Sequence, residues 1–524
     1  MTSPPHPDAI PGHIPAQQRS SIPERASTTA PEQTSPPQQT AAPEPAPAPS
    51  FRYAATSDRL APFVTHPVYR EAGSEGTAAP SAAGGETGSG RAGGPPASGG
   101  AYSLAALATW FTWPGLSTDL FPASPWAGLE RVRHAPPRPR GHARPDELRD
   151  RLEAAIERAI GDREHVAVAT SGGLDSAALL AVTARVCRRT DRRLLTVTMD
   201  IPDDRGRRPK VVVDRLLEFL GLRCPHLRVD PAPRRWPEPD WCAHGPRFDG
   251  FPRLHRGMAE LAAEAGAQVL LHGSGADQLL EAPGYMAARL LRPGSFGDLT
   301  AYLRDASAGG GPPVRELTAL LAGRLNRRVS SALYWPTAWP RRLQEHGSAL
   351  LSEEVHAQAC AWEDDYRRES ARVAAEAGAS WAEALMIHRT FPYDVMVPAT
   401  ELPEAAPYYD PAFAEYAFHL PQAARYSGAY ENEYLRRKRL VADLLPDGIG
   451  AVLPPYRQRG SQSYARYWRL ARVEPSLAVE RGLLRPDWRT RCRDTFEIAT
   501  ASAVELWLRG AEDRGARGSA GGTA

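Results

Sequence analysis

The stretch at 166–182, VAVATSGGLDSAALLAV, passes from one apolar run through two glycines into a second apolar run. The first run is typical of a buried strand, and the second keeps the spacing of a helix. The turn between them offers hydroxyls, glycines and a carboxylate, at Ser171, Gly172, Gly173, Asp175 and Ser176. We interpret this stretch as a strand, a tight turn and a helix.

The same alternation continues on both sides of this turn. Strand-like runs lie at 165–170, 193–200, 226–230 and 267–273. Helix-like runs lie at 174–188, about 209–221 and about 253–265. Strands that alternate with helices are typical of a parallel sheet covered on both faces. We therefore predict an α/β fold with a parallel sheet and helices on both faces, followed by a mainly helical C-terminal region without strands beyond about residue 300.

The ends of the chain differ from its middle. Residues 1–100 are rich in Pro, Ala, Gly and Ser and contain none of the twelve Trp, so they offer too little apolar surface to offset the entropy of ordering. We predict that they form a disordered tail; an aromatic island at 51–70 is a partner-binding motif, the remnant of a strand, or noise. The expected parts are the tail at 1–100, a short segment with a linker at 101–143, the α/β core at 144–300, a helical part at 301–510 and a second disordered tail at 511–524.

Charge and composition narrow the possible partners. A net charge of +2 gives no long-range attraction to nucleic acid or to a membrane surface. No run of 18 apolar residues occurs, and the N-terminus lacks the features of a signal peptide, so we expect a soluble cytoplasmic protein. Five widely spaced cysteines favour reduced thiols over disulfides or a cysteine-based zinc site.

The turn after the first strand is suited to phosphate. Glycines let backbone N–H groups approach an anion, the following helix adds its positive end, and Ser171 and Ser176 add hydroxyl donors. The lysine of a Walker-type loop is missing. Because Asp175 would repel a phosphate unless a divalent cation lay between them, the turn predicts a nucleotide bound with Mg²⁺.

A second carboxylate follows the fourth strand. The stretch LLHGSGADQLL at 270–280 places Asp277 behind a turn formed by Gly273, Ser274 and Gly275. If the first and fourth strands are neighbours, Asp175 and Asp277 can together hold one or two Mg²⁺ ions on a polyphosphate.

Several motifs now carry a family resemblance. SGGLDS resembles the pyrophosphate loop (PP-loop) of the N-type ATP pyrophosphatases. GSGADQ at 273–278, APYYDPAFAEYAFHLP at 406–421 and ASAVELWLRG at 501–510 resemble the asparagine synthetase group, especially the lasso-peptide macrolactam cyclases. The resemblance implies an enzyme that adenylates a carboxylate, releases pyrophosphate and lets an amine attack the acyl-adenylate. It also implies a precursor peptide as substrate, with a leader-recognition protein and a leader peptidase as partners.

The resemblance also assigns roles to residues. It implies that Ser171, Gly172, Gly173, Asp175 and Ser176, with Gly273 and Gly275, hold the ATP phosphates, and that Asp175 and Asp277 bind Mg²⁺. The backbone at Val197 would face adenine. Arg459 occupies the place of a family lysine that contacts the pyrophosphate, and Glu404 matches an acidic residue of the substrate pocket, with the register off by one. We interpret Lys438, within the basic run LRRKRL, as a residue on a solvent-exposed helix face.

Differences between this sequence and the family motifs favour some members of the family over others. Thr2 stands where a glutaminase would carry its cysteine, so ammonia from glutamine is not expected, and 101–143 resembles only the tail of that glutaminase domain. Ser274 replaces the Glu of asparagine synthetases and the Tyr of β-lactam synthetases. A small-molecule amide ligase of either kind remains the alternative. Less favoured are a serine hydrolase with Ser171 as nucleophile and an inactive scaffold.

Overall fold

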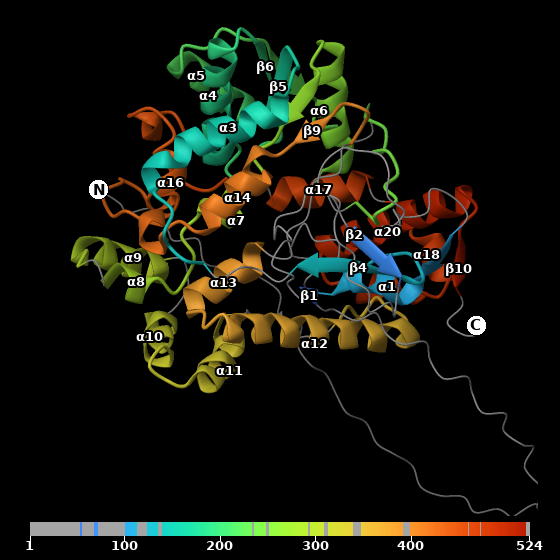
Figure 1. The fold of residues 1–524 in the computed structure, drawn as a ribbon. Helices are drawn as coiled ribbons and strands as arrows, with labels where there is room; N and C mark the ends of the chain where they lie inside the picture. Colours follow the sequence, from blue (N-terminus) through green and yellow to red (C-terminus); the bar gives the residue numbers. More distant parts are fainter. Residues whose placement is uncertain are drawn as a thin grey trace, which may run out of the picture. The chain divides into compact units, whose positions relative to one another are not determined.

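The computed structural model describes residues 53–54, 68–71, 100–112, 123–134, 139–232, 235–247, 251–291, 294–308, 313–338, 347–390, 399–458, 461–471 and 473–519. It contains a five-stranded sheet in the order β7-β6-β5-β8-β9, in which every neighbouring pair is parallel. Figure 1 labels β5, β6 and β9 of this sheet. The strands are β5 (His165–Ala169), β6 (Arg193–Met199), β7 (His226–Val229), β8 (Val269–Leu271) and β9 (Glu404–Ala405). The first four were predicted from the apolar runs; β9 was not.

Helices cover both faces of this sheet, as predicted. One face packs on α3 (Leu148–Ile160), α4 (Leu174–Arg189) and α5 (Pro209–Phe219). The other packs on α6 (Pro252–Glu264) and α17 (Ser461–Ala471). Successive strand residues point to opposite faces: Val166 and Val168 belong to the first cluster, and Ala167 belongs to the second. The continuous apolar strands are therefore explained by burial on both sides.

The chain after the sheet core is mainly helical, as expected. Its remaining helices of the described residues are α7 (Ala276–Leu280), α8 (Ala287–Leu291), α9 (Phe296–Ala308), α10 (Pro313–Ala322), α11 (Arg327–Ala338), α12 (Glu353–Glu376), α13 (Trp381–Thr390), α14 (Pro411–Phe418), α15 (Glu433–Arg437), α16 (Arg439–Ala442), α18 (Ser476–Glu480), α19 (Trp488–Arg491) and α20 (Thr495–Asp513). Asp410 caps α14 by accepting a hydrogen bond from the N–H of Phe413, with Pro411 at the first helical position.

Short strands depart from the prediction at both ends of the chain. Within the segment expected to be a disordered tail, β1 (Tyr53–Ala54) and β2 (Val68–Glu71) pair with β4 (Leu129–His134); the rest of 1–99 lies outside the described residues. Near the other end, β10 (Arg517–Ser519) pairs with β3 (Ala101–Ser103), where a second tail was expected. These strands, like β9, form because they pair with strands that are distant in sequence. The composition of a segment does not indicate such pairing.

A second core lies apart from the sheet. It joins β3, α1 (Leu104–Ala108) and the turn Thr109–Phe111 to α12, α18 and α20. Residues 102–111 and Trp126 are thus packed on the C-terminal helices. Among the described residues, no helix is long and apolar enough to span a membrane, and all five cysteines are thiols.

Candidate active site

The two predicted loops lie at neighbouring strand ends. β5 pairs directly with β8, Val166 opposite Val269 and Val168 opposite Leu271, which confirms the expected neighbourhood. The chain proceeds from β5 to β6 and β7 on one side and returns to β8 on the other. Ligands of open parallel sheets bind at such a reversal of strand order, beyond the carboxyl ends of the strands.

Glycines allow the two loops to touch. A Cβ atom on Gly273 would lie 3.3 Å from the backbone nitrogen of Ser176, so the backbones of the two loops are in close contact. Gly275 precedes α7 with a φ of +98°, and a Cβ there would lie 2.8 Å from Cδ1 of Tyr409. Any larger residue at Gly275 would strain the backbone and displace the ring.

The SGGLDS loop is held by its own hydroxyls. The hydroxyl of Ser176 donates to the carbonyl of Gly173 at 3.1 Å, and the N–H of Ser171 donates to the Ser176 hydroxyl at 3.2 Å. The N–H of Gly173 donates to the hydroxyl of Ser171 at 3.3 Å. Gly172 has a φ of +75°. These contacts within the loop fix its shape, and the N-cap residue of α4, Gly173, provides no side-chain cap. The role of the loop in holding phosphates stays a prediction.

A buried lysine joins the two carboxylates. Nζ of Lys438 forms ion pairs with Oδ2 of Asp175 and, at 2.5 Å, with Oδ1 of Asp277, and the Lys438 side chain is only 3% exposed. The interpretation of Lys438 as a solvent-facing residue was therefore wrong. The interpretation failed because it assumed one continuous helix. Lys438 lies between the end of α15 and the start of α16, with φ −117° and ψ 34°, so the solvent-exposed face of a continuous helix does not include it.

A second cation, Arg457, pairs with one of these carboxylates and with Glu281. Nη2 of Arg457 lies 2.5 Å from Oδ2 of Asp277, and Nη1 lies 3.6 Å from Oε2 of Glu281. The next residue, Gln458, lies over the SGGLDS loop, since a Cβ on Gly172 would be 3.6 Å from its Nε2. The predicted Arg459 lies outside the described residues. Sequence reasoning chose Arg459 and missed Arg457.

Burial and neighbouring charges shift the pKa values of Asp175 and Lys438. Burial raises the pKa of Asp175 to about 6; Lys438 opposes this shift, and the charge of Asp277 adds to it. Burial alone would lower the pKa of Lys438, but Asp175 and Asp277 raise it above its ordinary value. The ammonium is therefore charged at neutral pH, and it offsets the repulsion between the two carboxylates.

The carboxylates suit a hard divalent cation. Oδ1 of Asp175 is buried and has no hydrogen-bond partner among the described residues. Carboxylate oxygens are the ligands that Mg²⁺ takes in nucleotide sites. The residues present therefore fit the predicted metal, with Asp175 offering the free oxygen and Asp277 lying across Lys438 from it.

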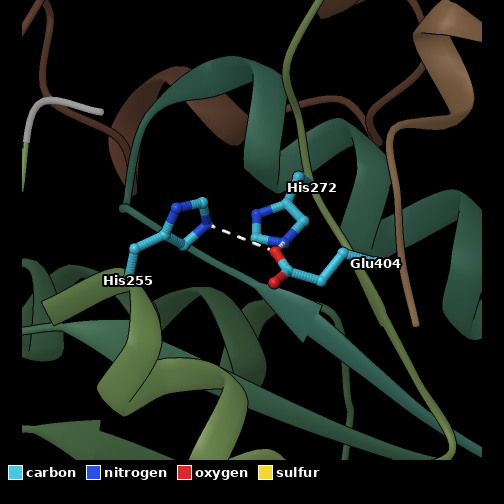
Figure 2. A group of neighbouring side chains, drawn as sticks. All are labelled: His255, His272 and Glu404. Carbon is cyan, nitrogen blue, oxygen red and sulfur yellow. Dashed lines mark ion pairs between the residues drawn. The ribbon is translucent and has the colours of Figure 1, made fainter. Parts of the chain in front are cut away.

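Glu404 belongs to a different cluster. Its Oε2 lies 2.7 Å from Nε2 of His272 and 3.5 Å from Nε2 of His255, and its Oε1 accepts a hydrogen bond from the N–H of Ala399 at 2.6 Å (Figure 2). Burial raises the pKa of Glu404, but His272 and His255 outweigh it and hold the pKa below the usual range. The structure does not join this residue to the Asp175–Asp277 pair through a direct contact among the described residues. Its role in the substrate pocket stays a prediction.

Val197 lies inside the sheet. It is fully buried in β6, and its carbonyl accepts a hydrogen bond from the N–H of Thr170 at 2.9 Å. Its contact with adenine also stays a prediction.

Fold and site together define an α/β protein with a glycine-rich loop and an acidic pair at the switch point of a parallel sheet. The asparagine synthase family model matches residues 147–451, more than half of the 524-residue chain, and the chain belongs to this family. Membership indicates an ATP-dependent amide ligase.

No curated protein matches the chain. Among solved structures, the chain is similar to the U34-tRNA thiolase NcsA from Methanococcus maripaludis with its [4Fe-4S] cluster, at 13% identity and a TM-score of 0.21. That match covers 33% of this chain and 59% of the thiolase, so it spans less than two thirds of the thiolase chain.

Proposed function

We propose that the protein is an AMP-forming carbon–nitrogen ligase that adenylates a side-chain carboxylate of a precursor peptide and closes a macrolactam with the peptide's N-terminal amine. The observation that carries the ligase part is Lys438, buried between Asp175 and Asp277 where the two loops meet. The macrolactam part rests on the resemblance of the sequence motifs.

In this proposal the SGGLDS loop binds the phosphates of ATP, and Asp175 and Asp277 hold Mg²⁺, which would supply charge stabilisation for the polyphosphate. A carboxylate oxygen of the substrate attacks the α-phosphorus, the bond to the β-phosphate oxygen breaks, and pyrophosphate leaves. Lys438 and Arg457 stabilise the negative charge on the departing pyrophosphate, because fixed cations in a water-poor site need no reorganisation. Arg459 is proposed to assist from the same segment.

The second step forms the amide. The amine nitrogen attacks the acyl carbon of the adenylate, the bond from that carbon to the AMP oxygen breaks, and the proton of the amine passes to water or to the released phosphate groups. An amine on the same peptide reacts at high effective concentration when the peptide is held in a folded shape. Water must be kept away from the acyl-adenylate meanwhile.

A cavity in the helical region has none of the named site residues in its lining, so the peptide assignment does not rest on it. The cavity, of about 700 Å³, lies among α8, α10, α11 and α13 and is lined by Tyr285, Tyr334 and Trp381, among others. Pockets of this size accept molecules larger than a single amino acid. A leader-recognition protein and a leader peptidase would deliver the peptide in the cytoplasm.

The test follows the nucleotide and the peptide separately. With Mg-ATP and its candidate precursor, its protease and its leader-binding partner, the protein should release AMP and pyrophosphate, and the core peptide should lose one water by mass spectrometry. Release of AMP with small carboxylates instead of peptide would favour the small-molecule ligase. Steady release of ADP and phosphate would contradict the proposal as a whole.

A further inference from the structure

A second cluster of metal-ligating side chains lies on the sheet. His255 comes from α6, His272 directly follows β8, and Glu404 lies on β9 (Figure 2). One ligand atom from each residue lies within 4.8 Å of the other two. Three elements distant in sequence thus bring two imidazoles and one carboxylate to a single point.

The carboxylate at this point is deeply buried. The Glu404 side chain is 0% exposed, His272 is 7% exposed and His255 is 13% exposed. The N–H of Ala399 holds one carboxylate oxygen, Oε1, and leaves Oε2 facing both rings. A buried carboxylate is stable only when hydrogen-bond donors or positive charge compensate it. Beyond the N–H of Ala399, the compensation comes from N–H groups of the imidazoles or from a cation shared by the three side chains.

One of the two distances fits a shared cation directly, and the other fits it after a small shift. In a tetrahedral zinc site with bonds of 2.0–2.1 Å, two ligand atoms stand roughly 3.3 Å apart. Nε2 of His255 and Oε2 of Glu404 are 3.5 Å apart, which is at the limit for a hydrogen bond but close to this ligand spacing. The 2.7 Å between His272 and Glu404 needs to widen by about 0.6 Å to reach the same spacing. A single proton would require only one histidine.

We propose that His255, His272 and Glu404 bind one divalent first-row transition ion, Zn²⁺ fitting best, with a fourth position open to water. Two imidazole nitrogens and one carboxylate oxygen are a ligand set of zinc and its neighbours, whereas Mg²⁺ takes oxygen ligands. The site is therefore chemically distinct from the Asp175–Asp277 pair. It does not depend on the ligase assignment.

The ion would join elements that position the active-site loops. His272 is followed directly by Gly273, which touches the SGGLDS loop, and β9 leads into the turn before α14. Binding would tie α6, β8 and β9 together, so the free energy of metal binding would add to the stability of this edge of the sheet.

The experiment uses the untagged full chain, dialysed against EDTA and titrated with Zn²⁺ in competition with a chromophoric indicator. We expect one Zn²⁺ per chain from this site. Loss of a residue that only hydrogen-bonds to a metal ligand already weakens metal binding by about 10- to 100-fold. We therefore expect a loss of at least about 100-fold in Zn²⁺ affinity for each of the ligand variants His255→Gln, His272→Gln and Glu404→Gln. His165→Gln, on β5 with its ring against the carbonyl of Gly266, is the matched histidine control and should bind as wild type.

A measurement on the wild-type chain guards against variants that fail to fold. Its Co²⁺ form should show visible bands of a four- or five-coordinate ion, without the thiolate bands that binding to a cysteine would give. Thiolate bands, absence of binding to the wild-type chain, or binding that survives in folded His255→Gln and His272→Gln would each overturn the proposal. Zinc binding abolished by Asp277→Asn but kept by those variants would place the ion at the acidic pair, and would overturn it as well.

Discussion

Replacing Lys438 by methionine is the sharpest test of the acidic pair. The change keeps an unbranched side chain that is one atom shorter and removes the ammonium that lies between Asp175 and Asp277. Removing one partner of a buried ion pair costs about 3–5 kcal/mol, because the other charge stays buried without compensation. Asp277 is 35% exposed, so water screens its share, and we expect the lower end, about 3 kcal/mol.

The assay is urea unfolding of the full chain without nucleotide, with and without Mg²⁺. Lys438→Met should lower the free energy of unfolding, and Mg²⁺ should restore part of the loss in the variant, because the ion supplies positive charge at the same oxygens. Lys438→Met combined with Asp175→Asn should lose less than the sum of the single variants, since the second change removes the uncompensated carboxylate. The rate of AMP formation should fall by at least about 10²-fold.

Two results would refute this reasoning. A Lys438→Met protein as stable as wild type without Mg²⁺ would mean that the ion pairs contribute nothing to folding. Additive losses in the double variant would mean that Lys438 and Asp175 do not interact. Lys438→Arg is the charge-matched control, and it should keep more stability than Lys438→Met even if the wider guanidinium fits the buried space poorly.

Further changes test the rest of the site and the fold. Asp175→Asn and Asp277→Asn should each lower the rate of AMP formation at saturating Mg²⁺ by about 10²-fold or more; wild-type rates would contradict a metal role. Gly275→Ala should lower the free energy of unfolding in urea by about 2 kcal/mol. The alanine would have to adopt a positive φ, and its Cβ would lie 2.8 Å from a ring carbon of Tyr409. Burial lowers the pKa of His419 to about 4, so the stability it gives is present above its unfolded pKa near 6.5 and is lost as the pH falls toward 4, by up to about 3 kcal/mol. His419→Gln should flatten the pH dependence of unfolding in that window, and an unchanged slope would contradict the shift.

The sheet core could be predicted because its signals are local. The strands β5, β6 and β8 are short segments rich in apolar residues, and each strand from β5 to β8 is followed along the chain by a helix-like segment. The neighbourhood of Asp175 and Asp277 was also accessible, since two glycine-rich turns at strand ends meet when their strands pair. Periodicity and turn chemistry carry this kind of information directly.

The missed features depend on contacts between distant segments. β9 has two residues and β10 has three, too few for any period to appear. The cluster of His255, His272 and Glu404 joins a helix, a strand end and a second strand, so no spacing in the sequence indicates it. Such elements are fixed by tertiary pairing, which overrides local propensity.

Lys438 shows where composition helps and where it stops. Only two of the 63 basic residues are lysines, so each lysine was a candidate for chemistry that arginine cannot perform. Lys210 forms an exposed pair with Asp214 at 2.5 Å, and its side chain is 43% exposed, whereas Lys438 is 3% exposed. Rarity therefore selects both residues, and burial separates them. A compact ammonium fits between two carboxylates where a planar guanidinium fork would need more room, which gives Lys438, and not Lys210, a physical reason to be lysine.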